Sequence, residues 1–188
     1  MSATPPLSLF EAVERGEAGA MNQLIAAWLP MVIAWCGRLG GPKINREDAA
    51  HDVMIVVIKR HQKVDGASKF PAWLFSVTRN IISRHRRKAW LRRWVPGDVP
   101  DAADPISTRR PEFSDTARWV WEVLEELPDA QREALILCDL EGRTREEAAE
   151  LLAVPVGTVK GRLRLGRKRF RKLAHVRGYV TSSVEVGG

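Results

Sequence analysis

The stretch that decides the fold covers residues 144–173 and reads TREEAAELLAVPVGTVKGRLRLGRKRFRKL. Thr144 followed three residues later by Glu147 is typical of a capping box, so a short helix is expected to begin here. A tight turn at Ala153, Val154 and Pro155 separates this helix from a longer basic one. A short capped helix, a turn of about three residues and a basic helix form the pattern in which the second helix enters the DNA major groove.

The long helix is predicted to be amphipathic. Its buried side is expected to consist of Val156, Val159, Leu163, Phe170 and Leu173, which recur at helical spacing. The other side is expected to bind DNA and carries Gly157, Thr158, Lys160, Gly161, Arg162, Arg164, Leu165, Lys168 and Lys172. Glycines let the backbone approach DNA, while threonine and basic side chains reach base edges or phosphates. Basic amphipathic helices also bind membranes, but the capped helix and turn favour DNA.

The charge distribution points to a polyanionic partner. The chain has 188 residues, a net charge of +7 and a pI near 9.9. Residues 84–93 and 160–177 hold fifteen of its 30 Lys and Arg and no carboxylate. Because a merely solvated surface usually mixes both signs, these two clusters are predicted to face phosphates.

The remaining pattern predicts an all-α fold of two small helical domains joined by a flexible linker. No segment has the period-two alternation of a strand. Four prolines interrupt the region after Trp94, where apolar periodicity is lost. The expected divisions are an N-terminal domain over residues 1–94, a linker over 95–113, a helix-turn-helix domain over 114–177 and a tail over 178–188.

Two helices of the first domain carry candidate binding faces. One is expected to begin at Asn45 and to reach about His61, with Ala49, Val53, Val56 and Arg60 on one side. The next is expected to begin near Ser68 and to bury Phe70, Leu74, Val77 and Ile81. Its other face would carry Trp73, Asn80, Arg84 and Arg87, where an aromatic ring can stack on a base and cations can hold phosphates. Trp73 alternatively covers an edge of the core.

The sequence gives little support to other classes of protein. The four histidines and the two cysteines, Cys36 and Cys138, lack metal-ligand spacing, and no glycine-rich phosphate loop occurs, so neither an enzyme nor a cofactor nor a metal site is expected. The cysteines are expected to be buried thiols of a cytoplasmic protein. No secretory signal is visible. The uncharged residues 24–36 fall short of the ~20 residues that span a bilayer, so they are expected to form a core helix without membrane insertion.

Three segments resemble one family, the bacterial RNA polymerase sigma factors, and within it the extracytoplasmic-function (ECF) group. VPVGTVKGRL, within residues 127–173, is similar to the family's region four. REDAAHDV at 46–53 and FPAWLFSVTRNIISRHRR at 70–87 are similar to parts of region two. The segments follow the family's order along the chain. One departure is Ala153, which stands at a turn position usually held by Gly; a left-handed backbone there would cost roughly 1 to 2 kcal/mol.

The resemblance implies a dissociable, non-catalytic initiation subunit of RNA polymerase that recognises and melts promoter DNA. Asp48, His51, Asp52 and Ile55 would dock on the clamp helices of the largest polymerase subunit. Minus-ten DNA would be bound by Ser68, Lys69, Trp73, Asn80, Arg84 and Arg87, with one unstacked base captured. Region four would bind the minus-35 element and the flap of the second-largest subunit. An anti-sigma factor is a possible further partner, and the protein would be associated with the nucleoid. The main alternative is a helix-turn-helix regulator that acts without core polymerase.

Overall fold

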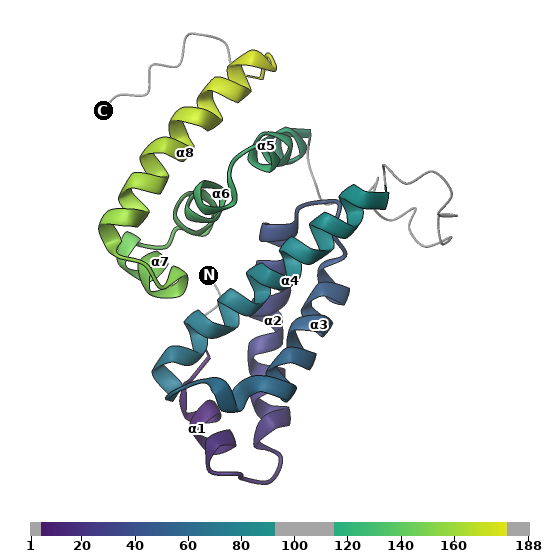
Figure 1. Cartoon of the computed structure of the whole chain (residues 1–188), viewed down its shortest axis with the longest axis vertical. Helices are drawn as coiled ribbons and strands as arrows, with labels where there is room; N and C mark the ends of the chain where they lie inside the picture. Colours follow the sequence, from purple (N-terminus) through teal and green to yellow (C-terminus); the bar gives the residue numbers. More distant parts are fainter. Residues whose placement is uncertain (1–4, 93–114, 180–188) are drawn as a thin grey trace. The chain divides into compact units, whose positions relative to one another are not determined.

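All regular elements in the described residues are helical, which confirms the predicted fold class (Figure 1). The structure is a computed structural model that describes residues 5–92 and 115–179. Contacts between Cα atoms divide the chain into two compact units, Met1–Arg110 and Pro111–Gly188. The expected linker over residues 95–113 lies outside the described residues, so the domain boundaries stay predictions.

The N-terminal unit is built around a long apolar helix. Its elements are α1 (Ser8–Glu14), α2 (Ala20–Gly40), α3 (Arg46–Arg60), η1 (His61–Lys63), η2 (Ala67–Lys69) and α4 (Phe70–Arg92). Helices α3 and α4 both pack on α2 and on each other. Trp28 contacts Phe70 edge-on at 5.2 Å between ring centroids, and Trp35 contacts Phe75 in the same way at 5.0 Å. These fully buried rings form the centre of the N-terminal core.

Helix α2 is longer than residues 24–36, so the length argument against a bilayer-spanning helix was wrong. The helix continues through Pro30, which lies on its exposed side. By length and composition alone, α2 could cross a membrane. A core helix passes the same test, and Leu24, Trp28 and Val32 are buried against the rest of the unit. We therefore assign α2 to the core of this domain.

The buried arc of α3 does not coincide with the side that carries Ala49, Val53, Val56 and Arg60. Asn45 caps the helix as expected: its Oδ1 accepts hydrogen bonds from the backbone N–H of Glu47 at 3.0 Å and of Asp48 at 3.2 Å. The buried residues, however, are Ala49, Ala50, Val53, Met54 and Val57, whereas Val56 is half-buried and Arg60 is exposed. Because α3 packs against both α2 and α4, its buried arc is wider than one stripe and is rotated away from Arg60.

The C-terminal unit consists of α5 (Asp115–Glu125), α6 (Asp129–Leu135), η4 (Ile136–Leu140), α7 (Arg145–Leu152) and α8 (Val156–Val176). Helix α8 packs on α6 and α7 (Figure 1). Its buried residues are Val159, Leu163, Gly166 and Ala174. Phe170 and Leu173 are half-buried, and the prediction for Val156 was wrong, because this residue is 39% exposed in the first turn of the helix.

Residues beyond α8 still belong to the folded unit. Tyr179 stacks on Trp119 of α5 with 5.2 Å between ring centroids, and its hydroxyl donates to Glu122 Oε2 at 2.8 Å. This hydrogen bond is the main reason why the pKa of Tyr179 is raised above 10.0. Arg177 pairs with Glu122 and Glu126 beside it. These contacts fasten the end of α8 to α5, although the sequence placed Tyr179 in the tail.

Candidate nucleic-acid and polymerase interfaces

The predicted helix-turn-helix is present as α7, a three-residue turn and α8. Thr144 and Glu147 form the expected capping box: Thr144 Oγ1 accepts from the Glu147 N–H at 3.1 Å, and Glu147 Oε2 accepts from the Thr144 N–H at 2.8 Å. The backbone hydrogen bond from Thr144 is the first reason why the pKa of Glu147 is lowered from 4.5. Ala153 has φ 52 and ψ 48, which confirms the left-handed turn suspected from the sequence.

The face of α8 that was expected to bind DNA is open to solvent. Seven of its nine predicted residues are exposed, and Gly161 and Arg162 are half-buried; the exposed ones are Gly157, Thr158, Lys160, Arg164, Leu165, Lys168 and Lys172. A Cβ placed on Gly157 or Gly161 would meet no described atom within 4 Å beyond the adjacent residues and the backbone of α8 itself. A Cβ on Gly166, in contrast, would lie 3.2 Å from Leu135 Cδ1. The fold therefore explains the small residue at 166 but not those at 157 and 161.

Acidic residues of the C-terminal unit neutralise two of the nine cations on and just after α8. Arg167 makes a bidentate pair with Asp139, with Nε at 3.0 Å from Oδ2 and an Nη at 2.7 Å from Oδ1. Arg177 pairs with Glu122 and Glu126. The other seven have no ion-pair partner in the described part of the chain: Lys160, Arg162, Arg164, Lys168, Arg169, Arg171 and Lys172. This density of uncompensated charge suits a phosphate backbone.

The candidate minus-ten residues lie on η2 and along α4. Ser68 and Lys69 are exposed on η2, where Lys69 Nζ pairs with Asp65 Oδ2 at 2.5 Å. This pair lowers the pKa of Asp65. Asn80, Arg84 and Arg87 are exposed on α4, spaced by four and three residues, so they share one face.

Trp73 serves the core and the surface together. Its ring lies 6.0 Å from that of Phe70, and Phe70 in turn stacks on Phe10 of α1 at 4.5 Å. Trp73 is nevertheless only half-buried, so part of the ring remains accessible. Both interpretations of this residue, a cover for the core and a platform for a base, are compatible with its position.

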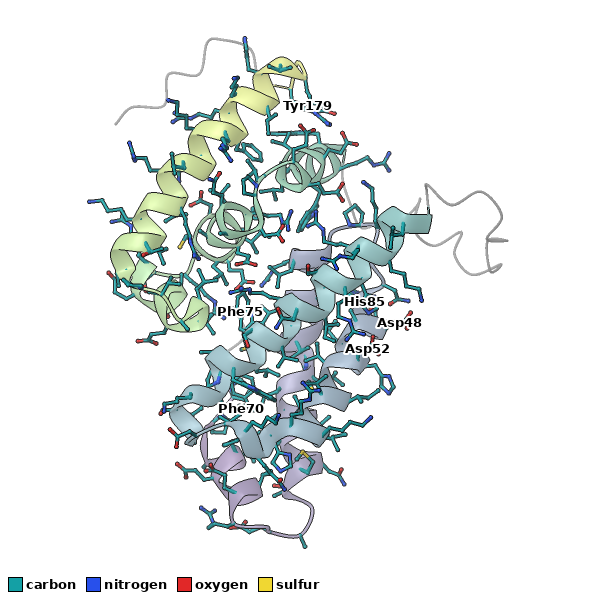
Figure 2. All side chains as sticks on the ribbon, in the orientation of Figure 1. Asp48, Asp52, Phe70, Phe75, His85 and Tyr179 are labelled. Carbon is teal, nitrogen blue, oxygen red and sulfur yellow. The ribbon has the colours of Figure 1, made fainter. Side chains whose placement is uncertain are left out.

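The candidate polymerase-docking residues share one face of α3, at helical spacing of three or four residues. Asp48 and His51 are exposed, and Asp52 and Ile55 are partly exposed. Figure 2 shows Asp48 and Asp52 on the side of α3 that also faces His85 of α4. His85 Nε2 lies 2.9 Å from Asp52 Oδ2. The sequence did not predict this contact between His85 and Asp52.

The two thiols differ in their surroundings. Cys36 is fully buried, and burial raises its pKa to about 12. Cys138 is only half-buried, which corrects the expectation that both are core residues, and desolvation is again the largest cause of its raised pKa. Among the described residues, no group of three His, Cys, Asp or Glu could hold a metal ion.

Comparison with known proteins matches both units to one family. Residues 24–92 match Sigma-70 region 2, and residues 117–170 match Sigma-70, region 4. The ECF RNA polymerase sigma factor EcfG of Rhodopseudomonas palustris is 31% identical over 159 residues, which cover 82% of this chain and 84% of that protein. The chain therefore belongs to the sigma-70 family of RNA polymerase sigma factors.

Within this family it is an ECF sigma factor, a protein that acts with RNA polymerase to initiate transcription at promoters. Members of the family are non-catalytic initiation factors that work in the bacterial cytoplasm. The helix-turn-helix regulator acting without polymerase, our main alternative, is thereby superseded.

Two solved structures share the fold. The sigma factor RpoE from Bartonella quintana, in complex with the anti-sigma factor NepR, is 25% identical with a TM-score of 0.57, and the match covers 85% of this chain and 99% of that one. CnrH in complex with the cytosolic domain of CnrY gives a TM-score of 0.63 at 21% identity, covering 90% and 97%. At 21% identity, the likeness to CnrH supports the fold alone.

Proposed function

We propose that the two units of this sigma factor divide promoter recognition between them. The N-terminal unit binds core polymerase and melts the minus-ten element, and the C-terminal unit binds the minus-35 element through α8. The observation that carries the proposal is the solvent-facing side of α8. It combines seven cations that have no ion-pair partner among the described residues with two glycines whose lack of a side chain the fold does not require.

The contacts of α8 follow from its orientation in a helix-turn-helix. The N-terminal part of such a helix enters the major groove. Thr158, Lys160 and Arg164 would then reach base edges or nearby phosphates, with the open sites at Gly157 and Gly161 allowing close approach. Leu165, 46% exposed, adds an apolar contact. The same unit would also contact the flap of the second-largest polymerase subunit.

The docking face of α3 would bind the clamp helices of the largest polymerase subunit. Its carboxylates, Asp48 and Asp52, suit basic side chains on the partner. Ile55 and the exposed Ile58, one and two turns further along α3, would supply an apolar contact. Met54, which lies in the same stretch, is 5% exposed and belongs to the core instead. The aliphatic part of this docking face is therefore small.

The surface of η2 and α4 would open the minus-ten element. Unpairing a short stretch costs a few kcal/mol, and stacking of a base on an aromatic side chain returns about 1 to 3 kcal/mol. The accessible part of Trp73 would provide this stacking, and Arg84 and Arg87 would hold the phosphates of the displaced strand. Ser68, Lys69 and Asn80 would read the unstacked base.

Control of the protein would come from a partner. The similar RpoE from Bartonella quintana forms a complex with an anti-sigma factor, and a protein of that kind would compete with core polymerase for this chain. We further propose that the protein has no catalytic activity by itself and is associated with the nucleoid when bound to core.

The test is run-off transcription with purified core polymerase and a promoter library. We expect start sites that core alone does not use. Trp73→Ala and Asn80→Ala should then reduce permanganate reactivity in the melted region while leaving the gel shift of a closed promoter complex unchanged. Absence of new start sites would contradict the proposal, and equal loss of melting and closed-complex binding would contradict the division between the two units.

A further inference from the structure

One side-chain pair connects the two functional helices of the N-terminal unit. His85 on α4 and Asp52 on α3 are 33 residues apart in sequence, and His85 Nε2 lies 2.9 Å from Asp52 Oδ2. The two side chains point toward one another in Figure 2. Their exposed fractions are 29% for His85 and 49% for Asp52. The pair therefore sits at the rim of the interface between the two helices rather than in the core.

The position of each partner gives the pair a functional context. Asp52 shares its helical face with Asp48, His51 and Ile55, the face that we propose docks on polymerase. His85 directly follows Arg84 on the helix that we propose holds minus-ten DNA. Only Oδ2 of Asp52 is engaged; in the described residues no hydrogen bond is made by Oδ1, which remains available to a donor on another protein.

We propose that His85 is a positioning residue for core binding. The inference rests on the proposed docking role of α3. By donating to Oδ2, His85 fixes the Asp52 carboxylate in one rotamer and leaves Oδ1 directed outward, toward a cationic side chain of the polymerase. A side chain that is ordered before association loses less conformational entropy on binding, so the free protein is preorganised for the core.

If the pair had a purely structural role, its loss would lower the stability of the N-terminal unit; the positioning role predicts instead that stability is kept and affinity for core polymerase falls. Half-exposed pairs of this kind contribute little to the stability of a fold, because solvent screens them. Loss of the His85 hydrogen bond should therefore leave the thermal unfolding of the N-terminal unit nearly unchanged. Affinity for core polymerase, in contrast, depends on the carboxylate geometry at the docking face and should fall.

The experiment measures the dissociation constant of the full chain for purified core polymerase in a double-mutant cycle. We expect Asp52→Leu and His85→Leu each to weaken binding by roughly three- to tenfold, the range for the net contribution of one ordinary hydrogen bond, because solvent screens the charge at this partly exposed site. The double variant should be no weaker than the worse single variant. His85→Gln, whose amide nitrogen can replace Nε2 as the donor, should stay within about twofold of the unmodified protein.

The matched control is Ser83→Leu, a change of similar character at an exposed position of α4 outside the pair. It should leave core affinity unchanged. If His85→Leu proves unstable, His85→Asn takes its place, because the shorter amide does not reach Asp52 Oδ2 as Nε2 does.

Three results would overturn the inference. These are additive losses in the double variant, a His85→Gln protein as weak as His85→Leu, and an Asp52→Leu protein that binds weakly while His85→Leu binds normally. If instead neither Asp52→Leu nor His85→Leu changes affinity, Asp52 is no docking residue and the proposed role of α3 falls as well. An unmodified chain that does not bind core at all would refute the proposed function itself.

Discussion

Gly161→Ala should stabilise the C-terminal unit and weaken its binding to the minus-35 element. Gly161 lies inside α8, where glycine is less favourable than alanine because it leaves the unfolded backbone more freedom. Beyond the adjacent residues and the backbone of α8 itself, no described atom lies within 4 Å of the position that the new Cβ would take. The fold therefore gains the helical propensity of alanine without a steric cost.

The expected gain is about 0.8 to 1 kcal/mol, the difference between Gly and Ala in a helix interior. DNA binding should change in the opposite direction. If the backbone of α8 approaches the groove at Gly161, the methyl group displaces it, and we expect a loss of affinity of about tenfold, or 1.4 kcal/mol. No charge is removed, so the slope of affinity against salt concentration should stay the same.

Stability is best followed by native-state hydrogen exchange at the amides of α8, because a chain with two units need not unfold in one step. Affinity is measured with holoenzyme on a responsive promoter, with and without its minus-35 element. Gly166→Ala is the control: its Cβ would lie 3.2 Å from Leu135 Cδ1 and 3.3 Å from the backbone oxygen of Gln131. This crowding should cancel the gain in stability.

Two outcomes would refute the reasoning. A Gly161→Ala protein that is no more stable would show that the open space at this position is filled or that α8 frays there. A protein that is more stable but binds the minus-35 element normally would show that DNA does not approach α8 at Gly161, and the proposed recognition face would have to move along the helix.

Four further predictions concern stability and reactivity. Ala153→Gly should raise the stability of the C-terminal unit by up to about 1 kcal/mol in urea unfolding, since it relieves the left-handed strain at φ 52 but adds freedom to the unfolded chain. Thr144→Ala should cost about 1 kcal/mol in the same assay. Because the pKa of Glu147 is lowered in the folded protein, the stabilisation from its capping carboxylate is present above pH 4.5 and should be lost as the pH falls through the folded pKa. A Thr144→Ala protein should therefore lose less stability on acidification than the unmodified protein. Cys36, with a pKa of about 12, should resist iodoacetamide at pH 8 until the protein unfolds, and labelling of the native protein at Cys36 would contradict this expectation. Because the thiol ionises more easily in the unfolded chain, the stability of the N-terminal unit should fall as the pH rises above 9.0.

Local signals in the sequence were sufficient for the helix-turn-helix. The Thr144 and Glu147 capping box and the strained turn at Ala153 depend on residues within a few positions of each other, and the structure contains both. Single-helix periodicity was less informative for α3, where it placed Ala49, Val53, Val56 and Arg60 on one side without identifying the buried arc. A helix packed against two neighbours buries a wider arc than one apolar stripe, and the centre of that arc depends on the neighbours.

Long-range pairs left no local signal. Asp52 and His85, like Asp139 and Arg167, meet only because two helices cross at a particular place, and nothing in the spacing of these residues specifies the crossing. Packing between elements also explains why α2 continues through Pro30, which the local sequence does not show. Proline removes one backbone hydrogen bond, but the buried residues on either side of it hold the helix against the core.

The cations of α8 that lack an ion-pair partner among the described residues fall into two groups, one on each side of the paired Arg167. With 21 residues the helix is about 31 Å long, whereas the major groove is about 12 Å wide, so one groove cannot hold it all. Its first half carries Lys160 and Arg164 beside the open glycines, where bases are within reach. Its second half carries Arg169, Arg171 and Lys172, which would lie outside the groove and can only meet phosphates. Since Asp139 already neutralises Arg167 between them, we propose that the first part of the helix reads sequence and that the second part adds affinity for any DNA.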